Sequence, residues 1–287
     1  MAALKPIAGI VVILVVSLAI AWAGSQGSVM VGTLPVFFLC ASVGFLLHWA
    51  VFIPSFMFQT EHYFDLTGSL SYIATVALAM LAIPDMDTRA QLLSLMVAVW
   101  AARLGTFLFV RVKKAGKDGR FDEIKKKFFR FAFTWTLGGA WVFITMAAAL
   151  AAITSDQTRE LGALAYIGII IWIVGFTIEV VADYQKSVFR KNPDNKDKFI
   201  TSGLWGRSRH PNYFGEITLW FGVAVIALPV LEGWQYVTLI SPLFVAFLLI
   251  RVSGIPMLEK RAEDKWGSDP DYKRYVESTP VLFPKFS

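Results

Sequence analysis

The sequence predicts an all-α fold, a polytopic transmembrane helical bundle of seven to eight spans, with eight preferred and a short cytoplasmic C-terminal segment. The first observation is composition: 56% of the 287 residues are hydrophobic and 17% are charged, whereas soluble domains carry roughly 25% charged residues. The mean hydropathy is +0.59. The second is the recurrence of long apolar stretches, and the third is the clustering of basic residues between them. A nucleic-acid-binding domain, a disordered chain and a disulfide-stapled secreted module are excluded.

Each predicted span is a stretch of about 20 mostly apolar residues, the length that crosses the hydrocarbon core with all backbone groups paired. The eight segments are 7–24, 33–54, 67–84, 90–111, 131–153, 162–182, 214–230 and 236–253. The first follows Lys5 and resembles a signal peptide, but its length and weak cleavage motif indicate a span. The seventh is the least typical, because it contains Glu216 and stops at Pro229.

The basic residues predict the topology. They concentrate in segments 113–130, 186–209 and 260–285, whereas the loops 154–161 and 231–235 contain one basic residue, Arg159. With eight spans all three basic segments fall on the cytoplasmic side, and both termini are cytoplasmic. An odd number of spans would move the amino terminus outside. No repeat or linker divides the chain, so we expect a single integral membrane domain over 1–287 with the C-terminal segment folded back on it.

The content of cysteine and histidine limits the chemistry. Cys40 is the single cysteine and lies in an apolar stretch, which excludes a disulfide and indicates a packing role. The three histidines, His48, His62 and His210, are widely separated, and His48 lies in an apolar span. We therefore expect no metal site.

Two spans carry ionisable residues at helical spacing. The fourth has Trp100, Arg103, Phe107 and Arg111 along one face, and the sixth has Glu179, Asp183 and Arg190. A charge at mid-bilayer costs about 2.5–3.5 kcal/mol or more, so such residues indicate a polar interior or cavity. Snorkelling at helix ends explains Arg111 and Arg190. It explains Arg103 and Glu179 less well, because apolar sequence lies on both sides of them.

A polar cluster precedes and enters the third span: Gln59, Glu61, His62, Tyr63 and Asp65. One interpretation is a hydrated loop in which Asp65 caps a helix beginning at Thr67. The other is a reactive cluster, because a carboxylate, an imidazole and a phenol can polarise a carbonyl or move a proton. The turn 116–120 is basic and contains two glycines; it suits phosphate and equally an ordinary cytoplasmic loop. Glycine-rich nucleotide motifs are absent.

The densest polar run is 203–216, which reads GLWGRSRHPNYFGE. Pro211 favours a helix start there, and the first-turn amides suit an anionic group. Asn212 and Glu216 lie four residues apart on one helical face. Both side chains are therefore expected to address the same polar ligand.

This run resembles the signature of the steroid 5-alpha-reductase family, above all its bacterial branch. Similar matches occur at 65–69, 100–104 and 116–121, and along the C-terminal segment from Leu258 to Pro284. The resemblance implies a membrane oxidoreductase that binds NADPH in the cytoplasmic half of its bundle, and a bacterial inner-membrane location. It departs from the animal enzymes at Trp100, where they carry a tyrosine, and at Glu179, Ile255 and Glu259.

The resemblance and the polar clusters together predict the site. The residues expected to bind the cofactor are Arg103, Glu179, Asp183, Arg190, Arg209, His210, Asn212, Tyr213, Glu216, Arg251 and Glu259. The expected catalytic residues are Glu61, Tyr63 and Gln59, with Gln59 and Glu61 competing for one family position. Burial in apolar surroundings would favour a protonated Glu61, which would stabilise charge on the carbonyl oxygen of a 3-oxo-Δ4 steroid or similar enone during reduction of its conjugated C=C bond.

Two alternatives stay open. Isoprenylcysteine and phospholipid methyltransferases, which use S-adenosylmethionine, also carry an Arg-His-Pro-x-Tyr run before a carboxylate-bearing terminal helix. They usually have paired glutamates there, whereas this chain has Glu259-Lys260. The other alternative is a non-enzymatic membrane scaffold. As partners we expect a lipophilic substrate from the bilayer and membrane lipid, with no nucleic acid and no obligate protein partner.

Overall fold

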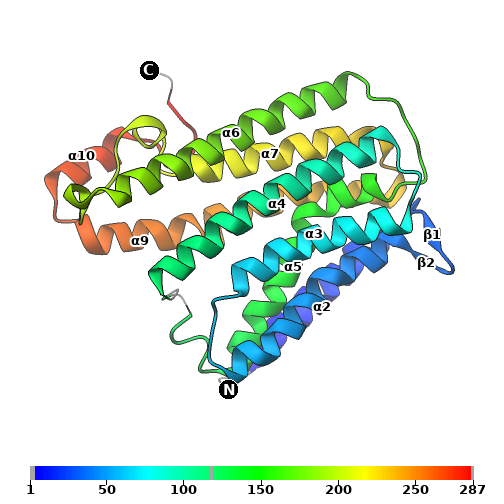
Figure 1. Cartoon of the computed structure of the whole chain (residues 1–287), viewed down its shortest axis with the longest axis horizontal. Helices are drawn as coiled ribbons and strands as arrows, with labels where there is room; N and C mark the ends of the chain where they lie inside the picture. Colours follow the sequence, from blue (N-terminus) through cyan, green and yellow to red (C-terminus); the bar gives the residue numbers. More distant parts are fainter. Residues whose placement is uncertain (1–3, 117–118, 120, 286–287) are drawn as a thin grey trace. The chain divides into compact units, whose positions relative to one another are not determined.

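The computed structural model describes residues 4–116, 119 and 121–285, and it is almost entirely helical (Figure 1). The described residues contain eight helical segments long and apolar enough to cross a membrane, so the protein is an integral membrane protein. The segments are Leu4–Gly24, Val36–Met57, Phe64–Ala82, Thr88–Lys114, Phe128–Ile153, Ala163–Lys191, Pro211–Val230 and Gly233–Trp266. The predicted all-α class with eight spans is therefore confirmed.

Most spans are single α-helices. These are α1 (Leu4–Gly24), α2 (Val36–Met57), α3 (Phe64–Ala82), α4 (Thr88–Ala115), α5 (Phe128–Ile153) and α6 (Ala163–Lys191). The seventh span consists of α7 (Pro211–Ala227) and the 3-10 turn η3 (Leu228–Val230).

The eighth span is segmented. It contains the 3-10 segment η4 (Gly233–Leu239), α8 (Ile240–Phe247), the π-helical segment η5 (Leu248–Val252) and α9 (Ile255–Trp266). The remaining elements are α10 (Pro270–Ser278), the short turns η1 (Pro193–Asn195) and η2 (Gly203–Gly206), and a hairpin of β1 (Met30–Val31) with β2 (Leu34–Pro35). The hairpin was not predicted.

The chain divides into two compact units. Unit 1 contains Met1–Ala165 and Ile226–Ser241, and unit 2 contains Tyr166–Val225 and Pro242–Ser287. The prediction of a single domain stays a prediction.

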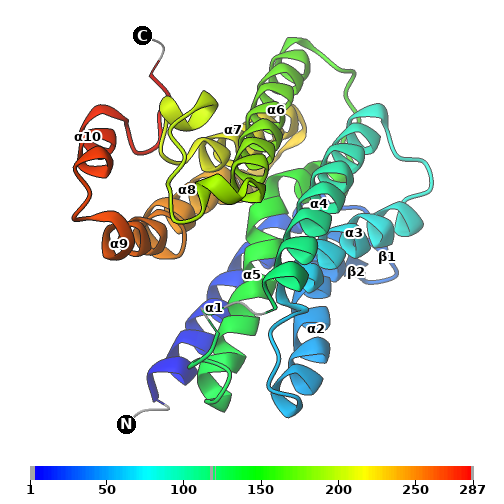
Figure 2. The same cartoon turned by 60° about the vertical axis from the view of Figure 1, so that its left-hand side comes forward.

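In unit 1, α5 is the central helix. It packs against α1, α2, α3 and α4, and Figure 2 shows it between α1 and α2. Nearly nine tenths of the residues in the most apolar stretch of α5 are buried. Alanines and glycines along α5 permit this close approach, because small side chains let neighbouring backbones come near.

A buried arginine joins three parts of unit 1. The Arg89 side chain, in the first turn of α4, donates to the backbone oxygens of Ile226 at 2.7 Å and Glu160 at 2.9 Å. Only 1% of Arg89 is exposed. Carbonyl acceptors compensate part of the cost of burying its charge, so Arg89 has a structural role that the sequence pattern did not reveal.

In unit 2, α6 and α7 approach at glycines. A Cβ atom placed on Gly175 would lie 2.5 Å from the Leu219 nitrogen and 2.6 Å from the Gly215 oxygen. A Cβ placed on Gly215 would meet the Glu179 nitrogen at 2.6 Å. The absence of a side chain at these positions lets the two backbones touch, and it fixes where the polar residues of α6 and α7 lie.

The C-terminal segment folds back within unit 2, as expected. The Tyr275 hydroxyl donates to the Trp205 oxygen at 2.7 Å, and the Arg209 amide donates to the Pro280 oxygen at 2.9 Å. Phe199 packs against the rings of Trp266 and Tyr272 with centroids 5.7 and 5.2 Å away. Burial raises the pKa of Tyr275 well above its usual value, so its hydroxyl stays a hydrogen-bond donor.

One expectation about helix ends is wrong. Asp65 does not cap a helix at Thr67, because α3 begins at Phe64 and places Asp65 inside its first turn. The Thr67 hydroxyl instead donates to the Tyr63 oxygen at 2.7 Å. An acidic residue in the first turn still stabilises the helix through its dipole.

Candidate functional site

The turn between α2 and α3 holds the predicted catalytic residues of unit 1. Gln59 has a φ of 51° and an exposed side chain, whose amide donates to the Phe56 oxygen at 2.7 Å. That left-handed conformation turns the chain sharply and directs Gln59 toward the end of α2. The structure therefore separates Gln59 from Glu61, which lies on the buried side of the same turn.

Glu61 forms a buried ion pair. Its side chain is 1% exposed, and the Lys125 ammonium, 19% exposed, donates to Glu61 Oε2 at 2.6 Å. A cation at this distance favours the carboxylate form. The expectation of a protonated Glu61 does not fit this geometry, because that expectation rested on burial alone and Lys125 lies beside the carboxylate. The available proton donor in this pair is the Lys125 ammonium.

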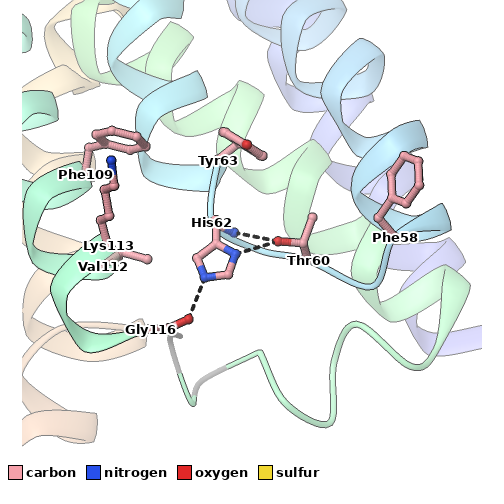
Figure 3. A pocket seen from close by; sticks show the side chains of 8 residues that line it. All are labelled: Phe58, Thr60, His62, Tyr63, Phe109, Val112, Lys113 and Gly116. Carbon is pink, nitrogen blue, oxygen red and sulfur yellow. Dashed lines mark hydrogen bonds between the residues drawn. The ribbon is translucent and has the colours of Figure 1, made fainter.

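His62 makes three hydrogen bonds, shown in Figure 3: its amide donates to the Thr60 hydroxyl at 3.3 Å, and both ring nitrogens have partners. Its Nε2 lies 2.6 Å from the Gly116 oxygen, and its Nδ1 lies 2.8 Å from the Thr60 hydroxyl. Since a carbonyl oxygen only accepts, Nε2 carries the proton and Nδ1 accepts from Thr60 in the neutral ring. Both nitrogens are thus engaged, and His62 braces the wall of a pocket.

The pocket has a volume of about 520 Å³. Its lining residues are Phe58, Thr60, His62, Tyr63, Phe109, Val112, Lys113 and Gly116 (Figure 3). Tyr63, whose side chain is half exposed, is the one predicted catalytic residue among them. Glu61 and Gln59 are not among the described lining residues.

The predicted face of α4 is confirmed by ring contacts. The Arg103 and Arg111 guanidinium carbons lie 5.4 and 6.0 Å from the centre of the Phe107 ring, one on each side in sequence. Trp100 is buried and meets Tyr72 of α3 edge to face at 5.1 Å.

In unit 2, one carboxylate joins two residues of the polar run. Glu259 Oε2 lies 2.7 Å from Arg209 Nη1, and Glu259 Oε1 lies 2.7 Å from His210 Nε2. Glu259 comes from α9, and the other two immediately precede α7, which begins at Pro211 as predicted. Tyr213 stacks on His210, with centroids 5.6 Å apart and planes inclined by 11°.

The protonation of this cluster follows from burial. His210 is 4% exposed, and burial lowers its pKa below the ordinary value although Glu259 opposes the shift. A neutral His210 donates from Nε2 to Glu259, so its Nδ1 is an acceptor. Among the described residues, neither His210 Nδ1 nor Arg209 Nε has a hydrogen-bond partner. The cluster therefore offers a ligand one acceptor and one cationic donor.

The other predicted cofactor residues of unit 2 divide by burial. Asn212 donates to Asp183 Oδ1 at 3.2 Å, and Glu179, Asp183 and Glu216 are all buried. Arg190 and Arg251 are exposed. Arg251 lies within the π-helical segment η5, a feature often found at functional sites.

Two further expectations concern ions. No group of three or more metal-ligating side chains occurs among the residues that the structure describes. The basic turn 116–120 includes Lys117, Asp118 and Arg120, which lie outside the described residues. Phosphate binding there stays a prediction.

Comparison with known proteins places the chain. A family model described as "Protein of unknown function (DUF1295)" matches residues 51–279. The chain belongs to this family. The match covers the turn of unit 1, the polar run and α9.

Two relatives carry names. The chain is 34% identical to the probable O-methyltransferase ustE of Ustilaginoidea virens over 139 residues, covering 39% of this chain and 49% of that protein. It is 41% identical to steroid 5-alpha-reductase DET2 of Gossypium hirsutum over 59 residues, covering 21% of this chain and 23% of that protein. The chain thus spans about half the length of the first and a quarter of the second. No solved structure matches the chain.

The structure also reveals residues that sequence reasoning missed. Lys125 belongs to a run of three lysines, and nothing local distinguishes the one that reaches Glu61, 64 positions earlier. Ser208 is buried, accepts from the His210 amide at 3.2 Å and donates to the Leu282 oxygen at 2.8 Å. Its place inside the polar run was the available signal.

Proposed function

We propose that the chain is an NADPH-dependent membrane reductase acting on the conjugated C=C bond of a lipophilic enone such as a 3-oxo-Δ4 steroid. The observation that carries the proposal is the Arg209–Glu259–His210 cluster. It leaves a buried acceptor and a cationic donor without a partner among the described residues. A dinucleotide, with its phosphates, hydroxyls and carboxamide, supplies complementary groups. The likeness to steroid 5-alpha-reductase DET2 supports the same reading.

The residues of unit 2 fit an anionic, hydrogen-bonding cofactor. Arg209 Nε would donate to a phosphate oxygen, and His210 Nδ1 would accept from an amide or hydroxyl. Glu259 holds both side chains through its two oxygens before any ligand binds. Asn212, oriented by Asp183, adds a further polar group to the first turn of α7.

The chemistry that NADPH would supply is a hydride for the conjugated C=C bond. Taken by itself, unit 1 offers groups suited to a substrate carbonyl. The Tyr63 hydroxyl, which lines the pocket, would donate to the carbonyl oxygen as negative charge develops there. The buried Glu61–Lys125 ion pair would keep the turn that carries Tyr63 in place. The Lys125 ammonium would also be available as a proton donor. A proton taken up at the α-carbon completes the reduction.

A second candidate function is methyl transfer from S-adenosylmethionine. The observation that favours it is the likeness to the probable O-methyltransferase ustE. The same cluster suits that cofactor. Arg209 would pair with the carboxylate of S-adenosylmethionine, and Glu259 would pair with its ammonium group. The single glutamate at Glu259-Lys260, in place of the usual pair, weighs against it.

Ligand-induced protection from heat separates the two functions. We expect NADPH to raise the unfolding temperature of the purified protein and S-adenosylmethionine to leave it unchanged, since binding to the folded state stabilises it. The Glu259→Gln variant should lose the protection, whereas Asp197→Asn, which alters an exposed pair with Lys265, should keep it. Protection by S-adenosylmethionine alone would establish the methyltransferase function. Protection by neither would remove both candidates and favour a membrane scaffold.

Turnover of a 3-oxo-Δ4 steroid tests the unit 1 residues. Tyr63→Phe should reduce kcat by about tenfold to a hundredfold, because a donor to the carbonyl oxygen is lost, while protection by NADPH is retained. Lys125→Met should also reduce kcat. The matched control is Lys126→Met, which breaks the exposed pair with Glu123 and should leave kcat unchanged. Unchanged turnover in Tyr63→Phe would remove Tyr63 from this role.

A bacterial inner-membrane location belongs to the same proposal and rests on the branch that the sequence resembles. Fractionation of the native host, with the protein followed by an antibody, tests it. Recovery in any other membrane would contradict the location without affecting the proposed reaction.

A further inference from the structure

We propose that the pocket in unit 1 binds the acidic end of an amphipathic ligand, a carboxylate carried on an apolar body. The pocket lies at the end of α4 and the beginning of α3, where two spans meet the polar boundary. Its lining combines three apolar side chains, Phe58, Phe109 and Val112, with one cation, Lys113 (Figure 3). No acidic residue is among the described lining residues.

The apolar side of the pocket suits a lipid-like body. Phe58 is 77% exposed, and Val112 is almost completely buried. An aliphatic or ring body placed along these side chains would cover the Phe58 ring. Removing apolar area from water is favourable.

The charge on the pocket wall is available to a ligand. Among the described residues, Lys113 makes no ion pair with a carboxylate, unlike Lys125, which is committed to Glu61. The backbone end of α4 does not suit an anion, since a helix C-terminus carries negative partial charge. Lys113 is therefore the group that would attract an acid, together with the hydroxyl of Tyr63.

The choice of a carboxylate over a phosphate follows from the number of donors. The His62 Nε2 proton is engaged by the Gly116 oxygen, and His62 Nδ1 accepts from Thr60. The Lys113 ammonium and the Tyr63 hydroxyl match a singly charged carboxylate, whereas a phosphate with near double charge calls for more cationic donors. If the proposed reduction holds, the preferred substrate is then a lipophilic enone that bears a carboxylate, and this extension alone rests on the proposed function.

Binding measured without turnover tests the proposal. The protein is placed in nanodiscs of phosphatidylcholine, and a fluorescent fatty acid is displaced by oleic acid or by oleyl alcohol. We expect oleic acid to bind about five- to tenfold more tightly, the size expected for one partly exposed ion pair. Equal displacement by the two would overturn the proposal, and this comparison of the unaltered protein needs no variant to fold.

Variants locate the preference. Lys113→Met should abolish the advantage of the acid, and Lys113→Arg should retain it. The matched control is Lys114→Met, because Lys114 lies in the same last turn of α4 but is not among the lining residues. Equal loss in Lys113→Met and Lys114→Met would overturn the site, since it would indicate a general surface charge effect.

Two further arms distinguish the ligand's source and its link to catalysis. Displacement of the probe by phosphatidylglycerol added to the nanodisc, at the potency of oleic acid, would show a headgroup site and overturn the carboxylate assignment. Turnover of an enone carboxylic acid and its methyl ester is then compared. Preference for the acid that disappears in Lys113→Met supports the substrate extension. Reduction of both at equal rates refutes it and leaves the proposed reductase intact, and reduction of neither removes the reductase while the binding result stands.

Discussion

Glu259 illustrates how one side chain can organise a site. Its two oxygens accept from Arg209 and His210, and the three side chains are 29%, 11% and 6% exposed. A carboxylate suits this position because both neighbours donate, whereas an amide presents one donor of its own. The polar run therefore depends on a residue from α9, far along the chain.

Glu259→Gln should destabilise the protein. Losing the charge leaves Arg209 without its counterion, so we expect the free energy of unfolding to fall by about 1–3 kcal/mol. Unfolding in detergent, followed by circular dichroism, measures the change. Asp197→Asn is the control, and breaking its exposed pair should change the free energy by less than about 0.5 kcal/mol. A loss no larger than in the control would contradict the organising role of Glu259.

His210 should make stability depend on pH. Its folded-state pKa lies below the unfolded value of about 6.5, because burial opposes the charged form. Its contribution is therefore complete above about pH 6.5 and is lost as the pH falls from there toward the folded pKa, since the unfolded state binds the proton first. The unfolding temperature measured between about pH 5 and 8 should fall less steeply for His210→Gln than for the unaltered protein. Parallel curves would refute this assignment.

At the scale of elements, the approach of α6 and α7 determines where the polar residues lie. Glycines allow backbone contact at Gly175 and Gly215, and the Glu179 amide lies beside Gly215. In a membrane, where burial of apolar surface drives helix association little, such close packing stabilises the contact. Asp183, one turn after Glu179, can then accept from Asn212 of α7.

Gly175→Val should disrupt this contact. Even its Cβ would lie 2.5 Å from the Leu219 nitrogen, and backbone atoms cannot move aside as a flexible side chain can. We expect a loss of about 1–3 kcal/mol, the usual cost of overpacking, measured by thermal or denaturant unfolding. Gly68→Ala in α3 is the control, because a Cβ there meets nothing within 4 Å. Equal stability of both variants would refute the close approach.

At the scale of the whole molecule, the distribution of basic residues predicts the orientation of the eight spans. The segments 113–130 and 260–285 are basic, whereas the loop 154–161 has a single basic residue, Arg159. Because basic loops stay on the cytoplasmic side, segments 113–130 and 260–285 should face the cytoplasm. The loop 154–161 should lie on the opposite side of the membrane.

Single cysteines test this topology. In a Cys40→Ala background, cysteines replacing Lys126 and Glu277 should react with a membrane-impermeant maleimide only from the cytoplasmic side. A cysteine replacing Gln157 should react only from the other side. Native Cys40 is buried, and its replacement by alanine removes any labelling that it could still contribute. Labelling of positions 126 and 277 from opposite faces would contradict an even number of spans between them and the predicted orientation.

Much of the fold could be predicted because insertion of a helix into the membrane depends on the hydrophobicity of one contiguous segment. A span is defined by about 20 consecutive residues, so the eight segments were recognisable one at a time, and α7 begins at Pro211 as its fixed φ favours. Helix ends were less predictable. Asp65 is a residue type that often caps a helix, but α3 starts at Phe64, one residue before Asp65. Nearby backbone and hydroxyl groups also compete for the hydrogen bonds of the first turn.

The sequence by itself determined that this is a membrane protein with eight apolar spans, and it identified the polar run before α7. Only the tertiary structure decided which charges meet: Glu61 with Lys125 across 64 positions, and His210 with Glu259 across 49. Spans follow from the transfer of contiguous apolar residues into lipid, a property that each segment carries alone. An ion pair depends on the packing of distant helices, and any of several lysines could have satisfied the sequence pattern at Glu61.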